Sequence, residues 1–222
     1  MSKPCPADRN NRRIAGTPLL QSINLWRRPL ALAVAVIAAV AVPVSLAATA
    51  AAAVGKTHRR HPARTCRGAT AAIGASTRPA LRAAVVCLIN RQRTARGLPA
   101  LAVDYKLNRS AQGWTDQLVS RHEFTHGANF AERISAVGFH WSQAGENIAT
   151  GFPTPYSVVA GWMRSTGHCK NILDPAFRDV GTGVNAHATV ASNGTWTQDF
   201  GLLVGQRPAS GNRAPAAGCP YG

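Results

Sequence analysis

The 222-residue chain is long enough for one substantial domain with extensions at its ends. Its 25 lysines and arginines, against 9 acidic residues, give a formal net charge of +16. Little of this surplus lies in the part that can fold, because Ser76–Arg207 holds 13 basic and 8 acidic residues. A basic run outside a folded face usually stays solvated or touches anionic surfaces weakly. The charge pattern therefore argues against specific nucleic-acid binding, which needs the charge on a folded face.

Residues 1–54 have the order of charge and apolarity that is typical of an export signal. A basic start that ends at Arg28 is followed by the uncharged run Leu30–Val54, rich in Ala, Val and Leu. Small residues between Ala47 and Ala53 offer cleavage sites, which favours a removable signal peptide. The run could also cross a bilayer core of about 30 Å, so an uncleaved signal anchor is the alternative. Both interpretations place the rest of the chain outside the cytosol, either secreted or held at the membrane.

Composition divides the remaining chain into three parts. Residues 55–75 are basic and contain few apolar side chains, which predicts a disordered linker. Residues 76–207 carry the periodic apolar patterns of one folded domain. Residues 208–222 are rich in Pro, Gly and Ala and are predicted to form an extended tail.

Four cysteines follow the leader: Cys66, Cys87, Cys169 and Cys219. An even number in an exported domain indicates two disulfides, with three possible connectivities. We favour Cys66–Cys87, which would tie the linker to the first helix, and Cys169–Cys219, which would pin the tail to the core. The alternative is metal ligation, but no C-x-x-C spacing is present to support it.

Apolar residues at helical spacing dominate the first half of the domain. One helix can be capped by Ser76 or Thr77 with Pro79 in its first turn, and Asp104 can cap a second. A short third helix is predicted over Phe130–Val137. A fourth begins at Thr154 and Pro155 and is predicted to break at Gly167, just before His168.

Short strands are predicted at Ile148–Thr150 and again beyond Pro175. Asn193-Gly194 suits a hairpin turn, because both residues tolerate a positive φ. Trp196 and Phe200 share one face of the strand that follows this turn. Helices first and hairpin strands later predict an α+β domain built in layers.

His122-Glu123-Phe124-Thr125-His126 matches the H-E-x-x-H pattern of zinc proteases. The pattern works only on a continuous helix, where the two histidines share a face and the glutamate holds the attacking water. Here Gly127 follows at once, where the helix should already have ended. A third ligand would have to be Glu132 or Glu146. We treat the protease interpretation as a minor alternative.

A second candidate site consists of His126, Glu146 and His168. Two imidazoles and a carboxylate suit zinc or another divalent metal, with a fourth position open for water. Their spacings are those of loops, so the sequence alone does not bring them together. Each can also be a structural residue that satisfies hydrogen bonds in a turn.

From about Leu88 to Gly201 the chain resembles the CAP superfamily, the sperm-coating-protein-like (SCP) extracellular domains, and is most similar to the bacterial branch. The matching residues occur in order along the chain: Leu88-Ile89-Asn90 with Arg93, Gly97–Leu101, Phe124-Thr125-His126, Arg133-Ile134 with Gly138, Gly145–Ala149, Gly161-Trp162-Met163 with Ser165, Gly167-His168 with Asn171-Ile172-Leu173, Val180–Val184 and Trp196–Phe200.

The resemblance implies an α-β-α sandwich with a small antiparallel sheet between helical layers and a large central cleft. In the family this cleft carries two histidines and two acids and has been associated with divalent metals. His126, Glu146 and His168 match three of these positions. The second acid, expected soon after the tryptophan of the fourth helix, is missing, because Met163, Arg164 and Ser165 follow Trp162. Ser165 and Asn147 are candidates to support the other three by hydrogen bonds.

We expect a monomeric, non-catalytic binding module whose cleft holds a divalent metal, a small apolar or lipid-like ligand, or a cell-wall component. One alternative is a metal-dependent hydrolase that activates water at His126, Glu146 and His168. No G-x-S-x-G nucleophile motif is present to suggest serine chemistry. Another alternative is an adhesion module that faces the cell wall, with the basic linker on anionic polymers.

Overall fold

The structure is a computed structural model that describes residues 19–26, 65–187, 193–208 and 218–219. The apolar run Leu30–Val54, the start of the predicted linker and most of the predicted tail lie outside the described residues. Within the described ranges, no helix is both long enough and apolar enough to cross a membrane.

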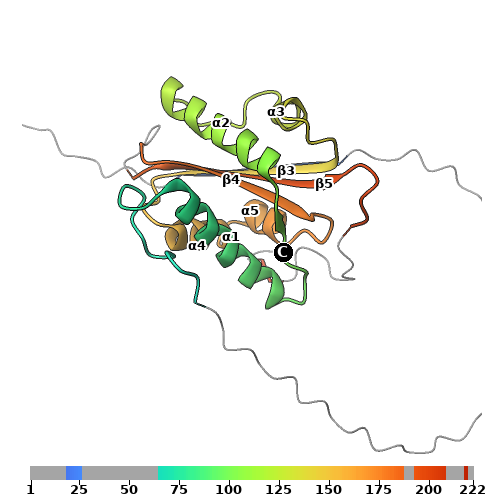
Figure 1. The fold of residues 1–222 in the computed structure, drawn as a ribbon, viewed down its shortest axis with the longest axis horizontal. Helices are drawn as coiled ribbons and strands as arrows, with labels where there is room; N and C mark the ends of the chain where they lie inside the picture. The colour runs from blue at the N-terminus through green and yellow to red at the C-terminus, as the bar shows by residue number, and fades with distance from the viewer. Residues whose placement is uncertain (1–18, 27–64, 188–192, 209–217, 220–222) are drawn as a thin grey trace, which may run out of the picture. The chain divides into compact units, whose positions relative to one another are not determined.

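Two layers of helices enclose one sheet (Figure 1). One face is covered by α2 (Tyr105–Arg121) and α3 (Phe130–Ala136). The other face is covered by α1 (Arg78–Thr94), α4 (Pro155–Met163) and α5 (Thr166–Ile172). The predicted α+β class and α-β-α sandwich are therefore confirmed.

The described sheet has the strand order β1-β3-β5-β4-β2. Its strands are β1 (Leu19–Trp26), β2 (Ala102–Val103), β3 (Trp141–Thr150), β4 (Asp179–Asn185) and β5 (Thr195–Leu203). Neighbours pair antiparallel, as predicted, except that the short β2 runs parallel to β4. β3 is longer than predicted, because a strand buried on both faces lacks the alternation that marks its ends in the sequence.

Local signals set most element boundaries as predicted. The side chains of Thr77, Asp104 and Thr154 accept hydrogen bonds from backbone N–H groups in the first turns of α1, α2 and α4. Asn193 and Gly194 have φ angles of 80° and 88°, which confirms the predicted positive-φ turn before β5.

The predicted break at Gly167 is wrong. The preceding helix already ends at Met163, and Gly167 and His168 lie inside α5. The two helices are separated at Ser165, whose φ and ψ of −106° and 123° are extended rather than helical. Gly167 serves close packing here, since a side chain at this position would overlap the Ser22 hydroxyl of β1.

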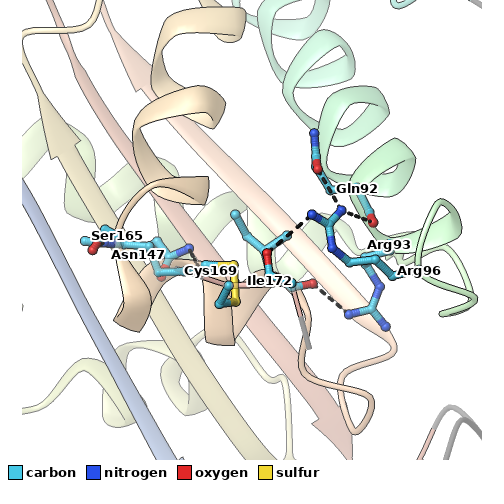
Figure 2. Close-up of a disulfide and its surroundings, with 10 residues drawn as sticks. Gln92, Arg93, Arg96, Asn147, Ser165, Cys169 and Ile172 are labelled. Atoms are coloured by element: carbon cyan, nitrogen blue, oxygen red, sulfur yellow. Dashed lines mark hydrogen bonds between the residues drawn. A yellow bond between two sulfur atoms is a disulfide. The ribbon is translucent and has the colours of Figure 1, made fainter. Parts of the chain in front are cut away.

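Arg93 organises the core beneath α1. Its side chain is fully buried, and its guanidinium donates to the backbone carbonyls of Pro99, Ile172, Asp174 and Phe177 at 2.8–3.3 Å. Figure 2 shows this side chain reaching toward Ile172, close to the disulfide of Cys169. One charged group therefore holds α1 to the chain between α5 and β4.

The disulfides join Cys66 to Cys87 and Cys169 to Cys219, which confirms the pairing we favoured. The folded part reaches further toward the N-terminus than the predicted boundary at Ser76. Cys66 is tied to α1, and the Ile73 side chain packs against the main core. The strand β1 also belongs to this compact unit, although its residues lie in the predicted leader.

Candidate functional site

His126 lies in the loop between α2 and α3, and its position is fixed by backbone contacts. α2 ends when His122 adopts a left-handed conformation with φ of 54°. The indole of Trp114 then donates to the Thr125 carbonyl at 3.2 Å, and Arg133 donates to the His126 carbonyl at 2.8 Å. The loop is therefore held at both of its neighbouring helices.

A hydrogen-bond network around the buried Glu146 joins it to His126 and Arg133. His126 Nδ1 lies 2.7 Å from Glu146 Oε1, and Arg133 Nη2 donates to Glu146 Oε2 at 2.6 Å. The Glu146 side chain is fully buried in β3. Arg133 also stacks over the Trp114 ring, with Cζ at 3.8 Å from the ring centroid. Both carboxylate oxygens of Glu146 are thus engaged within the protein.

Burial dominates the protonation of this network. It raises the pKa of Glu146 to about 7, against the opposing effect of Arg133. Burial, with a smaller effect from the positive charge of Arg133, lowers the pKa of His126 to about 4. The imidazole is therefore neutral at physiological pH, with Nδ1 directed to Glu146.

A second buried acid stands beside Glu146. Asp199 on β5 is the register partner of Glu146 on β3, and its exposed fraction is 1%. Burial raises the pKa of Asp199 well above its ordinary value, and the neighbouring Glu146 raises it further. Burial next to a second carboxyl group therefore favours the protonated form of Asp199.

His168 lies in α5, which covers the other face of the sheet, and its ring is near enough to His126 to be affected by its charge. Its exposed fraction is 2%, and its Nδ1 lies 2.7 Å from the Ser165 hydroxyl. Burial lowers the pKa of His168 to about 4, and the nearby charge of His126 lowers it as well. The backbone of Gln21 in β1 has the opposite, smaller effect.

Asn147 connects β3 to α5 from the face opposite Glu146. Its amide nitrogen donates to the His168 carbonyl and to Gln198 Oε1, both at 3.3 Å. Asn171 donates to Asn147 Oδ1 at 2.9 Å. Asn147 and Ser165, which we expected to support the site, lie together near the Cys169 disulfide in Figure 2. Their hydrogen bonds fix the backbone and ring of His168.

The H-E-x-x-H residues do not have the geometry of a protease. α2 ends at Arg121, so His122 and His126 do not share a helical face. His122 and Glu123 are exposed, whereas His126 turns inward to Glu146. The motif therefore does not form the metal-binding helix that the protease mechanism needs.

Comparison with known proteins gives the family. The profile of the cysteine-rich secretory protein family, CAP, matches residues 86–200, about half of the chain. The chain belongs to the CAP family. The matched range contains α2–α5, the strands β3 and β4, and the residues of the candidate site.

Two curated relatives come from Bacillus subtilis. The uncharacterized protein YkwD is 39% identical over 121 residues, which cover 52% of this chain and 45% of YkwD. The uncharacterized membrane protein YlbC is 29% identical over 105 residues, which cover 46% of this chain and 30% of YlbC. This chain thus spans less than half the length of either relative.

Similar solved structures are also bacterial. An extracellular SCP-domain protein from Bacillus anthracis is 25% identical, with a TM-score of 0.49 over 57% of this chain and 44% of that one. An outer surface protein from Borrelia burgdorferi is 20% identical, with a TM-score of 0.49 over 54% of this chain and 90% of that one.

Two residues next to Glu146 in the structure were not predicted from the sequence as part of the candidate site. We looked for a second acid after Trp162, whereas the buried acid beside Glu146 is Asp199. Arg133 was noted only as a matching residue, yet it carries the charge that faces Glu146. The alternation of Trp196 and Phe200 toward one core implies that Asp199 faces the other way. This alternation could have indicated from the sequence that Asp199 lies on the same face of the sheet as the candidate site.

The candidate site offers two imidazole nitrogens to a metal ion. His126 Nε2 and His168 Nε2 are both buried and have no hydrogen-bond partner among the described residues. The other ring nitrogen of each is held by Glu146 or Ser165, as is usual for metal-binding histidines. No three metal-ligating side chains converge in the described part of the chain, so Glu146 would orient rather than ligate.

Proposed function

We propose that this CAP domain is an exported, non-catalytic binding module whose cleft takes up a divalent metal ion through His126 and His168. The observation that carries the proposal is the pair of buried Nε2 atoms, which no described side chain engages. A buried polar atom without a partner costs free energy, and a metal ion would satisfy both. Both imidazoles are neutral at pH 7, as metal ligation requires.

A bound metal would supply a Lewis-acidic point to which the polar end of a small ligand could attach. The chain itself contributes the orientation of the two rings. Glu146 holds His126, Ser165 holds His168, and Arg133 compensates the charge of Glu146. A binding role fits better than hydrolysis, because Glu146 is fully buried and both of its oxygens already have partners in the protein.

The two disulfides support export from the cytosol. Two disulfides persist only in oxidising compartments, and both lie in the folded unit. The predicted leader, with its apolar run Leu30–Val54, provides a route out of the cytosol. Whether the leader is cleaved can be read from the N-terminal sequence of the protein recovered from culture medium.

Zinc titration of the oxidised chain, read as thermal stability, tests the site. Ligand at 100 times its Kd stabilises the native state by about 2.7 kcal/mol, which raises Tm by several degrees. We expect this shift to disappear in His126→Asn and in His168→Asn. His122→Asn is the matched control, because asparagine tolerates the left-handed conformation at this exposed position.

The outcomes separate the candidates. A zinc shift that survives both cleft substitutions but fails in His122→Asn would overturn the proposal. Turnover of an ester or peptide substrate that requires His168 in a folded protein would favour the hydrolase over the binding module.

A further inference from the structure

The outermost strand of the sheet comes from outside the family domain. β1 pairs antiparallel with β3 along its full length, from Leu19 opposite Thr150 to Trp26 opposite Gln143. The family match begins only at residue 86. Without β1, the β3 side away from β5 would be a sheet edge with unpaired N–H and C=O groups.

This edge lies in a groove with two walls that contact β1. On one wall, Gln21 donates through its side-chain amide to the Phe124 carbonyl at 3.3 Å, two residues before His126. On the other wall, Asn171 of α5 donates to the Ile23 carbonyl at 3.0 Å. The Gln21 backbone also lies close enough to the His168 ring to affect its pKa.

The side chains of β1 alternate between the two walls. Leu20 packs against the core under α1, α4 and α5, and Ser22 faces Gly167 of α5 on the same side. Ile23 packs on the opposite side, against the cluster that contains Phe130 and Ile134. Along this edge a strand therefore meets an apolar contact at Leu20, a position limited to a small side chain at Ser22, and a second apolar contact at Ile23 on the other side.

We propose that the groove along β3, between the Phe124–Gly127 loop and α5, is a receptor for an extended peptide strand. Residues 19–26 fill it in the uncut chain. When the leader is removed, an extended segment of a partner protein with the same apolar, polar, small, apolar pattern takes their place. Main-chain hydrogen bonds to β3 provide affinity, and the alternating pockets provide selectivity.

At the position of Ser22 the groove accepts only a small side chain. A Cβ on Gly167 would overlap the Ser22 Oγ, so a larger residue in place of Ser22 meets the α5 backbone. The contact next to this position does not depend on the side chain of the strand. Asn171 donates to the backbone carbonyl of Ile23, which any residue at that position would provide. The inference is tested separately from metal binding, because the β1 contacts with the Phe124 carbonyl and with Asn171 involve neither imidazole.

The test uses a fluorescently labelled peptide of residues 19–26, LLQSINLW, and the full chain with its own residues 19–26 replaced by alternating Gly and Ser. We expect saturable binding, measured by anisotropy, and slower hydrogen exchange of the β3 amides when the peptide is present. The unaltered chain should bind the peptide at least about tenfold more weakly, because its own strand competes at high effective concentration.

A matched peptide probes the small position. LLQLINLW, in which Ser22 is replaced by Leu, should bind about tenfold or more weakly than the parent peptide, because overpacking against Gly167 is unfavourable. Equal binding of both peptides, or binding without protection of β3, would overturn the proposal.

A second variant tests the groove without replacing residues 19–26, so its result does not depend on whether the Gly/Ser chain folds. Gly167→Val in the unaltered chain should expel β1 and speed exchange of the β3 amides, while leaving exchange in β4 and β5 unchanged. Unchanged protection of β3 in a folded Gly167→Val protein would contradict the groove as described.

Discussion

Glu146 and Asp199 are direct cross-strand partners with buried carboxyl groups on the same face of the sheet. Two such groups cannot both ionise at low cost when burial excludes water. Arg133 contacts Glu146 through a hydrogen bond, so the negative charge is best placed on Glu146 and the proton on Asp199. The candidate site thus carries two coupled acids, of which Glu146, beside Arg133, is the one that ionises more readily.

Replacing Asp199 by Asn should therefore remove a pH-dependent loss of stability that the unaltered protein has. The pKa of Asp199 is raised in the folded protein above its ordinary value of 3.8, so the folded state holds a proton that the unfolded state releases as the pH rises. Stability from this group is present below pH 4 and is lost at higher pH, by at most about 1.4 kcal/mol per pH unit. Asparagine carries no such proton.

Urea unfolding of both proteins between pH 4 and pH 8 measures this difference. The free energy of unfolding of Asp199→Asn, relative to the unaltered protein, should rise steadily with pH. A difference that stays constant, or that falls with pH, would show that Asp199 is ionised in the folded protein.

The residues of the candidate site could be selected from the sequence, but their geometry could not. Short motifs around His126, Glu146 and His168 marked the residues, whereas the pairing of Asp199 with Glu146 depends on strand register. Register is set by two strands about fifty residues apart in the sequence, and neither strand alternates cleanly, because both are buried on both faces. The sequence therefore marked the two histidines and Glu146 as candidates but not the cross-strand neighbour of Glu146.

Arg93→Lys should destabilise the fold although it keeps the charge. Four backbone carbonyls receive hydrogen bonds from the Arg93 guanidinium, and lysine offers a single point of contact in place of a planar fork. Each buried carbonyl left unsatisfied costs about 1–3 kcal/mol, so we expect a total loss of several kcal/mol.

Thermal unfolding of Arg93→Lys and Arg91→Lys measures this contribution. Arg91 is exposed on the same helix, so its replacement should change stability by less than about 0.5 kcal/mol. Similar Tm values for the two variants would mean that the carbonyls find other partners.

Gly183→Ala should weaken the packing of α2 on the sheet. A Cβ at Gly183 would overlap the Ala111 carbonyl oxygen, and one at Gly181 would overlap the Leu107 backbone, so α2 lies directly on the bare backbone of β4. Separating the two elements costs about 1–3 kcal/mol. Gly113→Ala is the opposite case, because a Cβ there meets nothing within 4 Å and alanine favours the helix by about 0.5–1 kcal/mol.

Chemical denaturation of the two alanine variants should move the midpoint in opposite directions. A midpoint for Gly183→Ala at or above that of the unaltered protein would contradict the close packing of α2 and β4.

The fold was more predictable than the extent of the folded unit. Caps at Thr77, Asp104 and Thr154 act within one turn, so the sequence displays them directly. β1 and Ile73 pack only through contacts with distant residues, and their own composition resembles a leader and a linker. Such segments become structured through tertiary contacts that local propensity does not contain.

The Cys169–Cys219 disulfide should contribute more to stability than Cys66–Cys87. The first joins residues 50 positions apart and the second joins residues 21 apart. Closing these loops in the unfolded chain is expected to stabilise the fold by about 4 and about 3 kcal/mol, respectively. Urea midpoints of the double serine variants Cys169→Ser/Cys219→Ser and Cys66→Ser/Cys87→Ser measure the two effects. The larger fall should belong to the first pair, and the reverse order would show that contacts of the tail or of residues 66–75, rather than loop closure, decide the contribution of each bridge.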